Sequence, residues 1–435
     1  MRKLSLWALA LLAAPAFSAA QQPPSAPAPR PSAPSSQTSA ERISIEDAIR
    51  LALEHNHALL AARTTILQNQ AQEITANLRP NPVLSWDAQF LPIFEPNKFT
   101  ADYIDNVAQF DLGIGYTFER GKKRQHRLKA AKDQTAVVRS LVSDNERQLV
   151  FNVSQQFVDV LLAESTLEFA QQDLDSFQKT VDISKERFRV GDMSEGDFLK
   201  IKLQLLQFQS DVSAARLAKL QSLAALRQLL GFETVSDDYD VQGTLDYQPV
   251  HADLKDLKNV AATNRPDLRA AQQAVTAAQS QLALQKANGK MDITGTFDYS
   301  HTAGASSGSF FYNMPLPIFN RNQGEIARAQ YAITQAQEQA SETAQQVLTD
   351  VVTAFANLRT NDQIIQLYEG GYVDQAKQSR DISEYAYRKG AASLLDYLDS
   401  ERTYRANQLA YRQALASYML ALEQMRQAVG TRTLP

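Results

Sequence analysis

Two aspartates, Asp396 and Asp399, stand three residues apart in the stretch YRKGAASLLDYLDSER, which covers residues 387–402. On a helix, side chains three apart lie on the same face, so both carboxylates would project together. Carboxylates in a first helical turn accept hydrogen bonds from free backbone N–H groups and interact favourably with the helix dipole. They can also pair with the arginines that follow, Arg402 and Arg405. The spacing therefore predicts a helix start with capping or ion-pairing acids.

An earlier stretch, FRVGDMSEGDFLKIKL at residues 188–203, repeats this pattern. It has the same glycine followed by Ser-x-x-Asp, and Asp197 stands where the later copy has Asp396. However, Lys200 occupies the position of Asp399. Because Ser-x-x-acid is the capping-box pattern, capping accounts for the aspartate that both copies share. It does not account for Asp399, which only the second copy carries.

The rest of the sequence offers little other chemistry. The 435 residues contain no cysteine, which excludes thiol nucleophiles, thiolate metal sites and disulfides. The five histidines are scattered, and His55 and His57 are two apart, so on a helix they would point to different faces. We interpret the acidic run DDYD at 237–240 as a solvated loop. We therefore expect no enzyme activity, no cofactor and no resident metal.

The charge balance and the N-terminal composition indicate the compartment. The net charge is −4 and no basic run exists, so nucleic-acid binding is not expected. Residues 1–20 have the basic start, short apolar core and small-residue end of a signal peptide, which predicts export. Residues 21–42, rich in Pro, Ser and Ala, are expected to be a linker. The remainder has no apolar run of about 20 residues, so a membrane position would require β-strands.

The repeat extends along the whole folded part. Gly191 corresponds to Gly390, and other pairs follow at an offset of about 200 residues. Each copy has the pattern of a helix, two strands, a long helix and a further helix. This predicts a first repeat at 43–231, a connector at 232–253 and a second repeat at 254–435. Gly191 and Gly390 would end the long helices at the turns of helical hairpins, as left-handed glycines commonly do.

Apolar periodicity predicts six helices, with an irregularity at Gly370-Gly371. A helix of about 70 residues is roughly 105 Å long, and two shorter helices placed end to end match it. We therefore expect a rod in which each long helix lies beside a stacked pair. The expected segments are 44–79, 120–189, 194–230, 254–288, 322–389 and 393–429.

Four other segments have the period of two that is typical of β-strands. Their apolar and aromatic residues share one face, and each segment is close to the roughly 9–11 residues that a tilted strand needs to cross a bilayer. A soluble half-buried ribbon would show the same alternation, but the equivalent placing of two strands in each repeat favours a membrane sheet. The segments are 83–91, 108–118, 291–301 and 309–318.

Four strands cannot close a barrel, and an open sheet edge is not viable in lipid. Three copies would supply twelve strands, enough for a channel, whereas two or four copies are the alternatives. The expected fold class is therefore mainly α with a β-barrel. It combines a long-helix α-barrel with a transmembrane β-barrel that is completed by trimerisation.

Four landmarks stand in order along the chain: ISIEDAIRLALEHNHAL, ANLRPNPVLSW, PLPIFNRNQGEIARAQ and YRKGAASLLDYLDSERTYRANQLAYRQALASYMLALEQMRQAVG. With these landmarks, the sequence from residue 43 to residue 429 resembles the TolC family of outer-membrane efflux ducts. The first landmark and the LRPNPVLS segment of the second are somewhat closer to the heavy-metal, CzcC-like branch of that family than to its multidrug branch.

The resemblance implies a homotrimer in outer-membrane lipid, with a large periplasmic portion and an equatorial belt that includes residues 231–252. It implies a passive exit channel that docks on a periplasmic adaptor (membrane fusion) protein and an inner-membrane pump, of the RND type. The substrate stays open between heavy-metal cations and drugs or other small molecules. The alternative from another class is a periplasmic coiled-coil adaptor or scaffold without a membrane barrel, which would not explain the four strands.

The resemblance also assigns roles at the periplasmic helix tips, which in the family coil inward to close the entrance. Asp396 and Asp399 match a ring of carboxylates at that constriction, and such a ring favours cations. Tyr387 and Asp197 match positions in the network that holds the tip closed. Ala392 stands where the multidrug prototype has an arginine, so this network is weaker here or built differently. The copy with two acids would then face inward, while the other copy stays outside.

Overall fold

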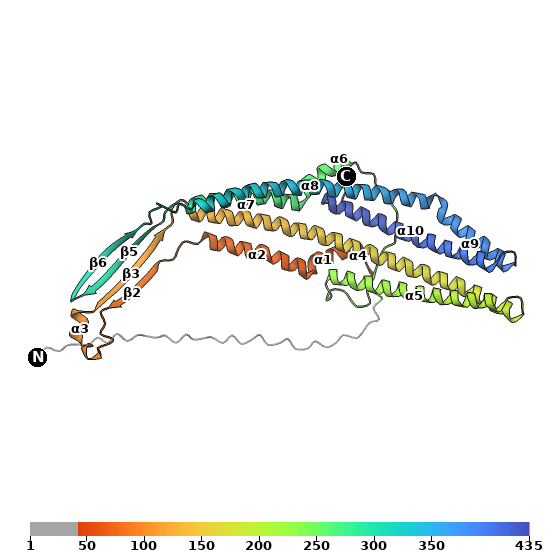
Figure 1. The fold of residues 1–435 in the computed structure, drawn as a ribbon, viewed down its shortest axis with the longest axis horizontal. Coiled ribbons are helices and arrows are strands. Elements are labelled where there is room, and N and C mark those ends of the chain that lie inside the picture. The colour runs from red at the N-terminus through yellow and green to blue at the C-terminus, as the bar shows by residue number, and fades with distance from the viewer. Residues whose placement is uncertain (1–41, 435) are drawn as a thin grey trace. The chain divides into compact units, whose positions relative to one another are not determined.

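The computed structural model describes residues 42–434. The predicted signal peptide at 1–20 lies outside the described residues, as does the predicted linker at 21–42 apart from Arg42. Within the described part, a four-stranded sheet lies at one end, and long helices run from it to two helical turns at the other end (Figure 1). No helix among these residues is long and apolar enough to cross a lipid bilayer.

The helices follow the same order twice. The first repeat contains α1 (Ile45–His55), α2 (His57–Asn77), α4 (Lys123–Arg189) and α5 (Glu195–Leu230). The second contains α6 (Leu254–Asn264), α7 (Pro266–Asn288), α8 (Gln323–Leu367), α9 (Val373–Arg388) and α10 (Leu394–Val429).

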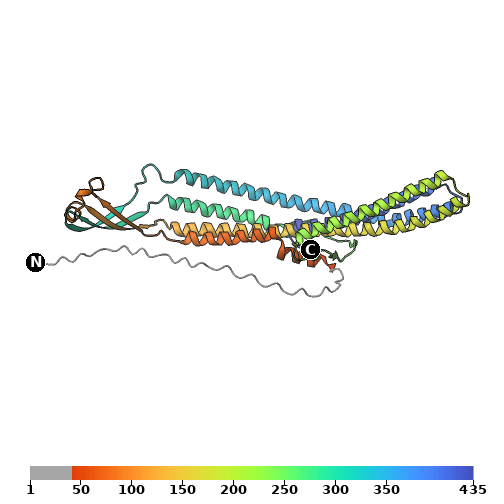
Figure 2. The same ribbon diagram turned by 90° about the horizontal axis from the view of Figure 1, so that it is seen from below.

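The helix α4 runs unbroken for 67 residues, a length of about 100 Å. It contains neither Gly nor Pro, the two residues that are most costly inside a helix. Helices α2 and α7 pack along one half of it, and α5 and α10 pack along the other half (Figure 1 and Figure 2). The first repeat therefore has the expected arrangement, a long helix beside two shorter ones placed end to end.

Two of the expected helices are divided, so their prediction as single helices is wrong. The segment at 44–79 breaks at Asn56, whose side chain accepts a hydrogen bond from the Leu59 N–H at 3.0 Å and so caps the start of α2. The segment at 254–288 breaks just before Pro266, because proline has no N–H and disfavours helical geometry in the residue that precedes it.

The second long helix, expected at 322–389, is also interrupted. A short π-helical segment, η2 (Tyr368–Tyr372), separates α8 from α9, and Gly371 within it has a φ of 106°. That φ is accessible to glycine but strained for other residues. The irregularity predicted at Gly370-Gly371 is therefore confirmed. The prediction of one continuous helix over 322–389 is wrong. Since α4 has no such break, the two repeats differ at this point.

The sheet is antiparallel, with the strand order β2-β3-β5-β6. Its strands are β2 (Val83–Gln89), β3 (Gln109–Phe118), β5 (Ile293–Thr302) and β6 (Ala305–Asn313). The central pair joins the two repeats, because β3 belongs to the first and β5 to the second. A 3-10 turn, η1 (Pro96–Lys98), and the short helix α3 (Ala101–Asn106) lie between β2 and β3. Within residues 42–434, the edge strands β2 and β6 have no further strand partner.

The fourth strand begins and ends earlier than the sequence predicts. The expected range is 309–318, but β6 ends at Asn313, so Leu316 and Ile318 follow the strand. The cause is a two-residue turn at Ala303-Gly304, where φ is 50° and 74°. Positive φ at both central residues is the geometry of a tight hairpin, which joins β5 directly to β6 and fixes their register.

The buried core lies midway along the helices, where the shorter helices of each repeat meet the longer ones (Figure 1). A parallel pair, β1 (Arg42–Ile43) with β4 (Asp240–Val241), fastens the start of the first repeat to the connector. Its apolar side chains join one cluster, and a second cluster lies between α6, α8 and α10. The buried members include Ile43, Phe157, Leu226, Leu230 and Val241 in the first, and Leu257, Val351, Ile365, Tyr418 and Met425 in the second.

Gly231, at the end of α5, provides a test of this packing. Its φ is 95°, and an added Cβ would lie 3.3 Å from both the Cβ and the carbonyl oxygen of His55. We expect Gly231→Ala to lower the free energy of unfolding by roughly 1–3 kcal/mol, because the backbone would be strained. Gly196→Ala, in open space near the other end of α5, is the control and should lose no stability. If circular dichroism gave the same midpoint of thermal unfolding for Gly231→Ala as for the wild type and Gly196→Ala, the prediction would be contradicted.

Candidate functional site at the helix tips

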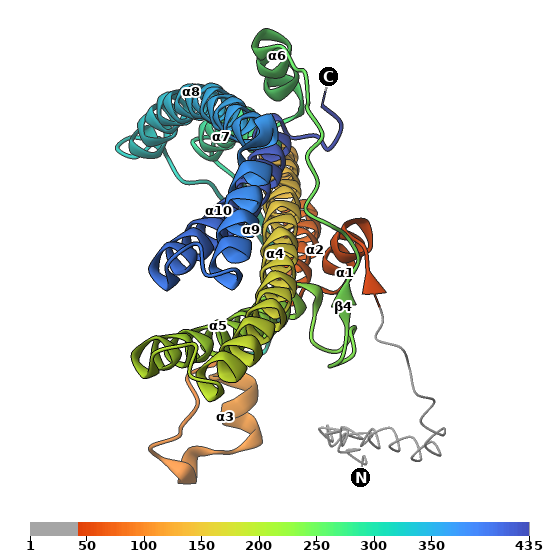
Figure 3. The same ribbon diagram turned by 90° about the vertical axis from the view of Figure 1, so that its right-hand side faces the viewer.

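Each repeat ends in a helical hairpin, and both hairpins turn at the end opposite the sheet (Figure 1 and Figure 3). The hairpin of α4 and α5 turns at Gly191, with a φ of 80°, and that of α9 and α10 turns at Gly390, with a φ of 75°. An added Cβ would meet nothing within 4 Å at either glycine. Glycine is therefore needed at both positions for the left-handed backbone conformation of the turn, and not because another group packs closely against it.

Ser194 and Ser393 cap the outgoing helices, and the shared aspartate stands three residues after each of them. In α10 the Ser393 hydroxyl accepts a hydrogen bond from the Asp396 N–H at 3.2 Å, and the Ser393 N–H donates to the Asp396 carboxylate at 3.3 Å. In α5 the Asp197 N–H donates to the Ser194 hydroxyl at 3.1 Å. The Asp197 carboxylate pairs with Lys200 at 3.1 Å, and hydrogen bonds from Ser194 and Lys200 lower its pKa. The capping interpretation is confirmed in both copies, and the reciprocal box is complete only in the second.

Asp399 has a different environment. Its carboxylate is exposed and pairs with Arg402 on the same helix at 2.6 Å, not with Arg405. An exposed pair three residues apart contributes only about 0–1 kcal/mol to stability. Asp399 lies one turn beyond the cap and contributes to no cap hydrogen bond. Of the two carboxylates in this copy, Asp399 therefore contributes little to folding within the single chain.

Tyr387 lies buried between the two hairpins. Its ring stacks on Tyr397, with centroids 5.4 Å apart and planes 7° from parallel. Arg187 lies over the same ring at 5.5 Å and donates a hydrogen bond to the Tyr387 carbonyl at 3.4 Å. Burial raises the pKa of Tyr387, and within residues 42–434 its hydroxyl makes no hydrogen bond to Asp197. In this chain Tyr387 thus holds the tips together by packing, together with Phe177, Val181, Ile201, Phe208, Leu394 and Tyr397.

A charged layer, which the sequence analysis did not identify, also joins the two hairpins. It consists of Asp173 on α4, Asp211 on α5, Arg380 on α9, and Glu401 and Arg405 on α10. Nε of Arg405 lies 2.6 Å from Oδ2 of Asp173, and Arg405 also pairs with Asp211. Nη1 of Arg380 lies 3.9 Å from Oε2 of Glu401. Arg405 therefore bridges its own hairpin to both helices of the other.

The two central carboxyls of the charged layer are almost fully buried. The side chains of Asp173 and Glu401 are 2% and 5% exposed. Burial raises the pKa of both groups, and the adjacent Asp173 carboxyl also raises that of Glu401, to about 8. The arginines are held against aromatic rings, with the Arg405 guanidinium 4.2 Å from the Phe208 ring centre. The charged layer is thus a desolvated polar contact inside an otherwise apolar seam.

The sequence contained one signal for this layer. Asp173 lies four residues after Phe169 and four before Phe177, both of which are buried. Likewise, Glu401 lies four residues after the buried Tyr397. Positions four apart share a helix face, so each acid occupies an apolar stripe where a charge needs a partner. The pattern could have identified buried acids, but it could not have identified their partners on other helices.

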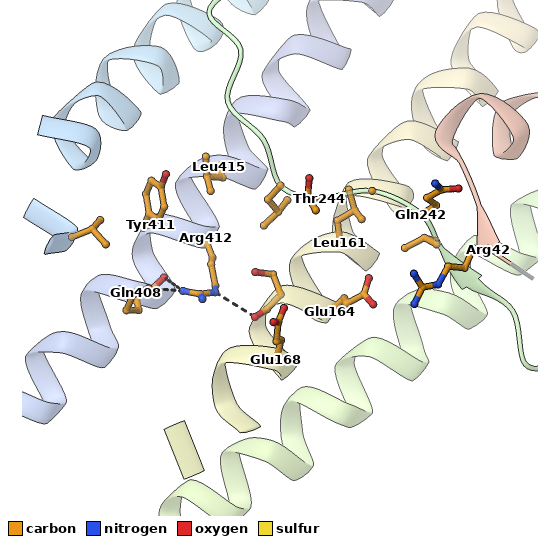
Figure 4. Close-up of a pocket in the computed structure, with 15 residues that line it drawn as sticks. Arg42, Leu161, Glu164, Glu168, Gln242, Thr244, Gln408, Tyr411, Arg412 and Leu415 are labelled. Atoms are coloured by element: carbon orange, nitrogen blue, oxygen red, sulfur yellow. Dashed lines mark hydrogen bonds between the residues drawn. The ribbon is translucent and has the colours of Figure 1, made fainter. Parts of the chain in front are cut away.

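A cavity of about 650 Å³ lies midway along the helices, between α4, α10 and the connector (Figure 4). Arg412 projects into this region and donates hydrogen bonds to the Ser165 carbonyl at 3.3 Å and to Oε1 of Gln408 at 2.8 Å. Glu164 and Arg42 also line it, so the cavity carries charges of both signs. Nowhere in residues 42–434 could a group of three His, Cys, Asp or Glu side chains hold a metal ion.

Known proteins share this sequence pattern and this fold. The outer membrane efflux protein family matches residues 48–232 and 257–431. The cobalt-zinc-cadmium resistance protein CzcC of Cupriavidus metallidurans is 23% identical over 392 residues, which are 89% of this chain and 88% of CzcC. The outer membrane protein TolC of Vibrio cholerae is 22% identical over 324 residues, 70% of this chain and 72% of TolC. The crystal structure of CusC has a TM-score of 0.73 at 19% identity, over 89% of this chain and 92% of that one.

The family matches two separate segments, one in each repeat, and together they cover most of the described residues. The likeness to CusC supports the same fold, with sheet and long helices in one chain. A periplasmic adaptor or scaffold is not favoured, because the matching family is that of outer membrane efflux proteins and the matching TolC is an outer membrane protein. The chain belongs to the outer membrane efflux protein family, that of the TolC-like channels.

Proposed function

We propose that the protein is the passive exit duct of a tripartite export system, spanning the outer membrane and the periplasm, with its helix tips as the gate. The observation that carries the proposal is the arrangement of one chain into a sheet with an exposed apolar face at one end and two helical hairpins at the other. A sheet of this kind suits lipid, and helices about 100 Å long can extend from it far into the periplasm.

The sheet supports the barrel. Leu84, Ile114, Phe297 and Phe310 lie opposite one another in a row across all four strands, and all four side chains are exposed. Such a row would be unfavourable in water but is favourable against lipid chains. The unpaired edges of β2 and β6 would be equally unfavourable in lipid, so other copies of the chain must pair with them. Three copies give twelve strands, and we therefore propose a homotrimer.

The helix α5 supports the same assembly. Exposed leucines recur along it at spacings of four and three residues in two groups, 199–206 and 217–220. The gap of eleven residues between the groups keeps the same heptad frame, which is the pattern of a coiled-coil seam. No helix within residues 42–434 covers this seam, so a helix of a neighbouring copy is the partner that we propose. The seam consists of Leu199, Leu203, Leu206, Leu217 and Leu220.

The gate that we propose lies at the tips. In a trimer, Asp396 and Asp399 would contribute six carboxylates to a ring at the constriction, which would attract cations. Asp399 supports this role because it is exposed and contributes little to folding. In the first repeat, Lys200 neutralises Asp197, so that hairpin would suit the outer side of the ring. Tyr387 would keep the closed hairpins in contact.

The partners and the substrate follow from the same proposal. A passive duct needs an energy source, so we propose that it docks on a periplasmic adaptor and an inner-membrane pump of the RND type. CzcC is named for resistance to cobalt, zinc and cadmium, which supports heavy-metal cations as the substrate. A carboxylate ring suits this cargo, and tight metal ligands would impede passage.

The first prediction from this proposed function concerns the location of the protein and the mass of its assembly. After expression of the full chain, the protein is expected in the outer-membrane fraction. Light scattering with detergent correction should give three times the mass of the exported chain, which is 48.3 kDa less the signal peptide. Soluble protein in the periplasm, or a monomer in mild detergent, would reject the duct and favour the periplasmic adaptor or scaffold instead.

The second prediction concerns the aspartates. In planar bilayers, the double variant Asp396→Ala and Asp399→Ala should lower the preference for cations over anions or raise the conductance, because the ring loses its charge. Ser393→Ala is the control, since it removes a cap hydrogen bond worth about 1 kcal/mol but leaves both charges in place. Double-variant pores with unchanged selectivity and conductance would argue against the ring.

The third prediction concerns the substrate. Cells that lack the gene should become more sensitive to zinc, cadmium and cobalt salts, and the wild-type gene should restore growth. Their tolerance of hydrophobic drugs should not change. The opposite pattern would reject heavy-metal cations as the cargo without rejecting the duct.

A further inference from the structure

The charged layer has an uneven number of charges. It contains three carboxyls, from Asp173, Asp211 and Glu401, but only two guanidinium groups, from Arg380 and Arg405. Asp211 lies at the rim with its side chain 32% exposed, so its charge stays hydrated. Asp173 and Glu401 are nearly fully buried, so ionising both of them away from water is costly, and one proton bound by this pair lowers that cost. Of the neighbouring acids, Asp381 is exposed and pairs with Arg380 at 2.8 Å, and Glu384 pairs with Arg388.

The proton has a defined place. The Asp173 and Glu401 side chains are both nearly fully buried in the layer, and repulsion from Asp173 disfavours a negative charge on Glu401. Asp173 lies against Arg405 at 2.6 Å, whereas Glu401 is 3.9 Å from its closest arginine nitrogen. The better-paired Asp173 is therefore the carboxylate, and Glu401 is the group that holds the proton. The two acids belong to different hairpins, so Glu401 keeps this buried environment only while the hairpins are in contact.

We propose that docking of the α9–α10 hairpin onto the α4–α5 hairpin takes up a proton at the Asp173–Glu401 pair, and that separation of the hairpins releases it. Glu401 is then a positioning residue for the gate, one that acts through the contact between hairpins and not on the cargo. The inference rests on the proposed function, because the docking matters to transport only if the tips form the gate.

The fold provides a hinge for such a movement. The segment η2 interrupts the second long helix above the α9–α10 hairpin, and Gly371 has a φ that other residues adopt only under strain. The corresponding helix α4 is continuous, so the α4–α5 hairpin has no such joint. Helix termini and small residues commonly absorb the backbone changes of a hinge. The hairpin that carries Glu401 is therefore the one that can swing.

The direction of the pH effect follows from linkage. When the hairpins are docked, burial and Asp173 raise the pKa of Glu401 from its usual 4.5 to about 8. When they separate, water reaches the carboxyl and its pKa falls towards the usual value. The stabilisation of the docked state is therefore complete below 4.5 and is lost as the pH rises through 8. In between, each pH unit shifts the balance towards separation by up to about tenfold.

Other titrating groups do not explain an effect at the tips in this range. The five histidines are at positions 55, 57, 126, 251 and 301, and none of them lies in α5, α9 or α10. His126 lies in the first turn of α4, at the opposite end of that helix from the charged layer. Tyr397 and Tyr404 lie beside the layer, but burial raises the pKa of both above the usual value of 10.

The experiment measures the distance between the two hairpins as a function of pH. The chain has no cysteine, so Lys185→Cys on α4 and Lys389→Cys at the end of α9 can carry two spin labels in the full-length protein. Labelled chains are mixed with an excess of unlabelled chains, so that pairs within one chain dominate. Pulsed electron–electron double resonance measures the distance between the two labels. Between pH 5 and pH 9, the fraction of molecules with the longer distance should increase as the pH rises.

Two variants assign the effect. Glu401→Gln keeps the shape and cannot ionise, so it should hold the short distance at every pH. Asp211→Asn, at the exposed rim of the same layer, should keep the pH dependence of the wild type. If Glu401→Gln does not fold, Asp173→Asn tests the same pair. In this variant, the change in the ratio of separated to docked hairpins between pH 5 and pH 9 should be at least tenfold smaller than in the wild type. A wild-type distance that does not change with pH, or a shift that persists in Glu401→Gln, would overturn the proposal.

Conductance measured on the same samples separates this inference from the proposed function. A pore that conducts while the distance ignores pH would reject the proton linkage and leave the duct intact. A distance that depends on pH in a protein with no pore would support the linkage and reject the gate.

Discussion

The unbroken helix α4 is the element on which the rest of the structure depends. Its 67 residues contain no Gly or Pro, so every turn can keep its backbone hydrogen bonds over about 100 Å. One half of α4 packs against α2 and α7 and the other half against α5 and α10, so it connects the sheet end to the tip end. The two repeats cannot shift along each other while α7 and α10, both from the second repeat, pack on this one helix of the first.

Duplication produced two similar hairpins, and small differences give them different properties. One hairpin continues a rigid helix, pairs Asp197 with Lys200 and has no interruption. The other follows the π-helical segment at Gly371 and carries the additional Asp399 and the buried Glu401. For the gate that we propose, these differences would provide one part that stays and one part that moves. The aromatic stack of Tyr387 on Tyr397 and the charged layer hold the two hairpins against each other.

The surfaces of the single chain also explain why it should assemble. A row of apolar side chains crosses the sheet, and a leucine seam follows α5, both of them exposed. Apolar patches of this kind indicate contact with lipid or with other subunits. The open edges of the sheet add the same requirement, because backbone groups without partners are not tolerated in lipid. One assembly of several chains satisfies all three conditions.

The sequence by itself determined the features that depend on local geometry. The repeat, the helical and strand periods, the caps at Ser194 and Ser393 and the irregularity at Gly370-Gly371 follow from spacing and backbone preference, which each segment carries alone. Only the tertiary structure decided the burial of Tyr387 and the choice of Asp173 and Asp211 as partners of Arg405. These depend on which distant segments lie side by side. A charge within an apolar stripe shows that a partner is needed, but the partner itself is fixed by the packing of helices far apart in the chain.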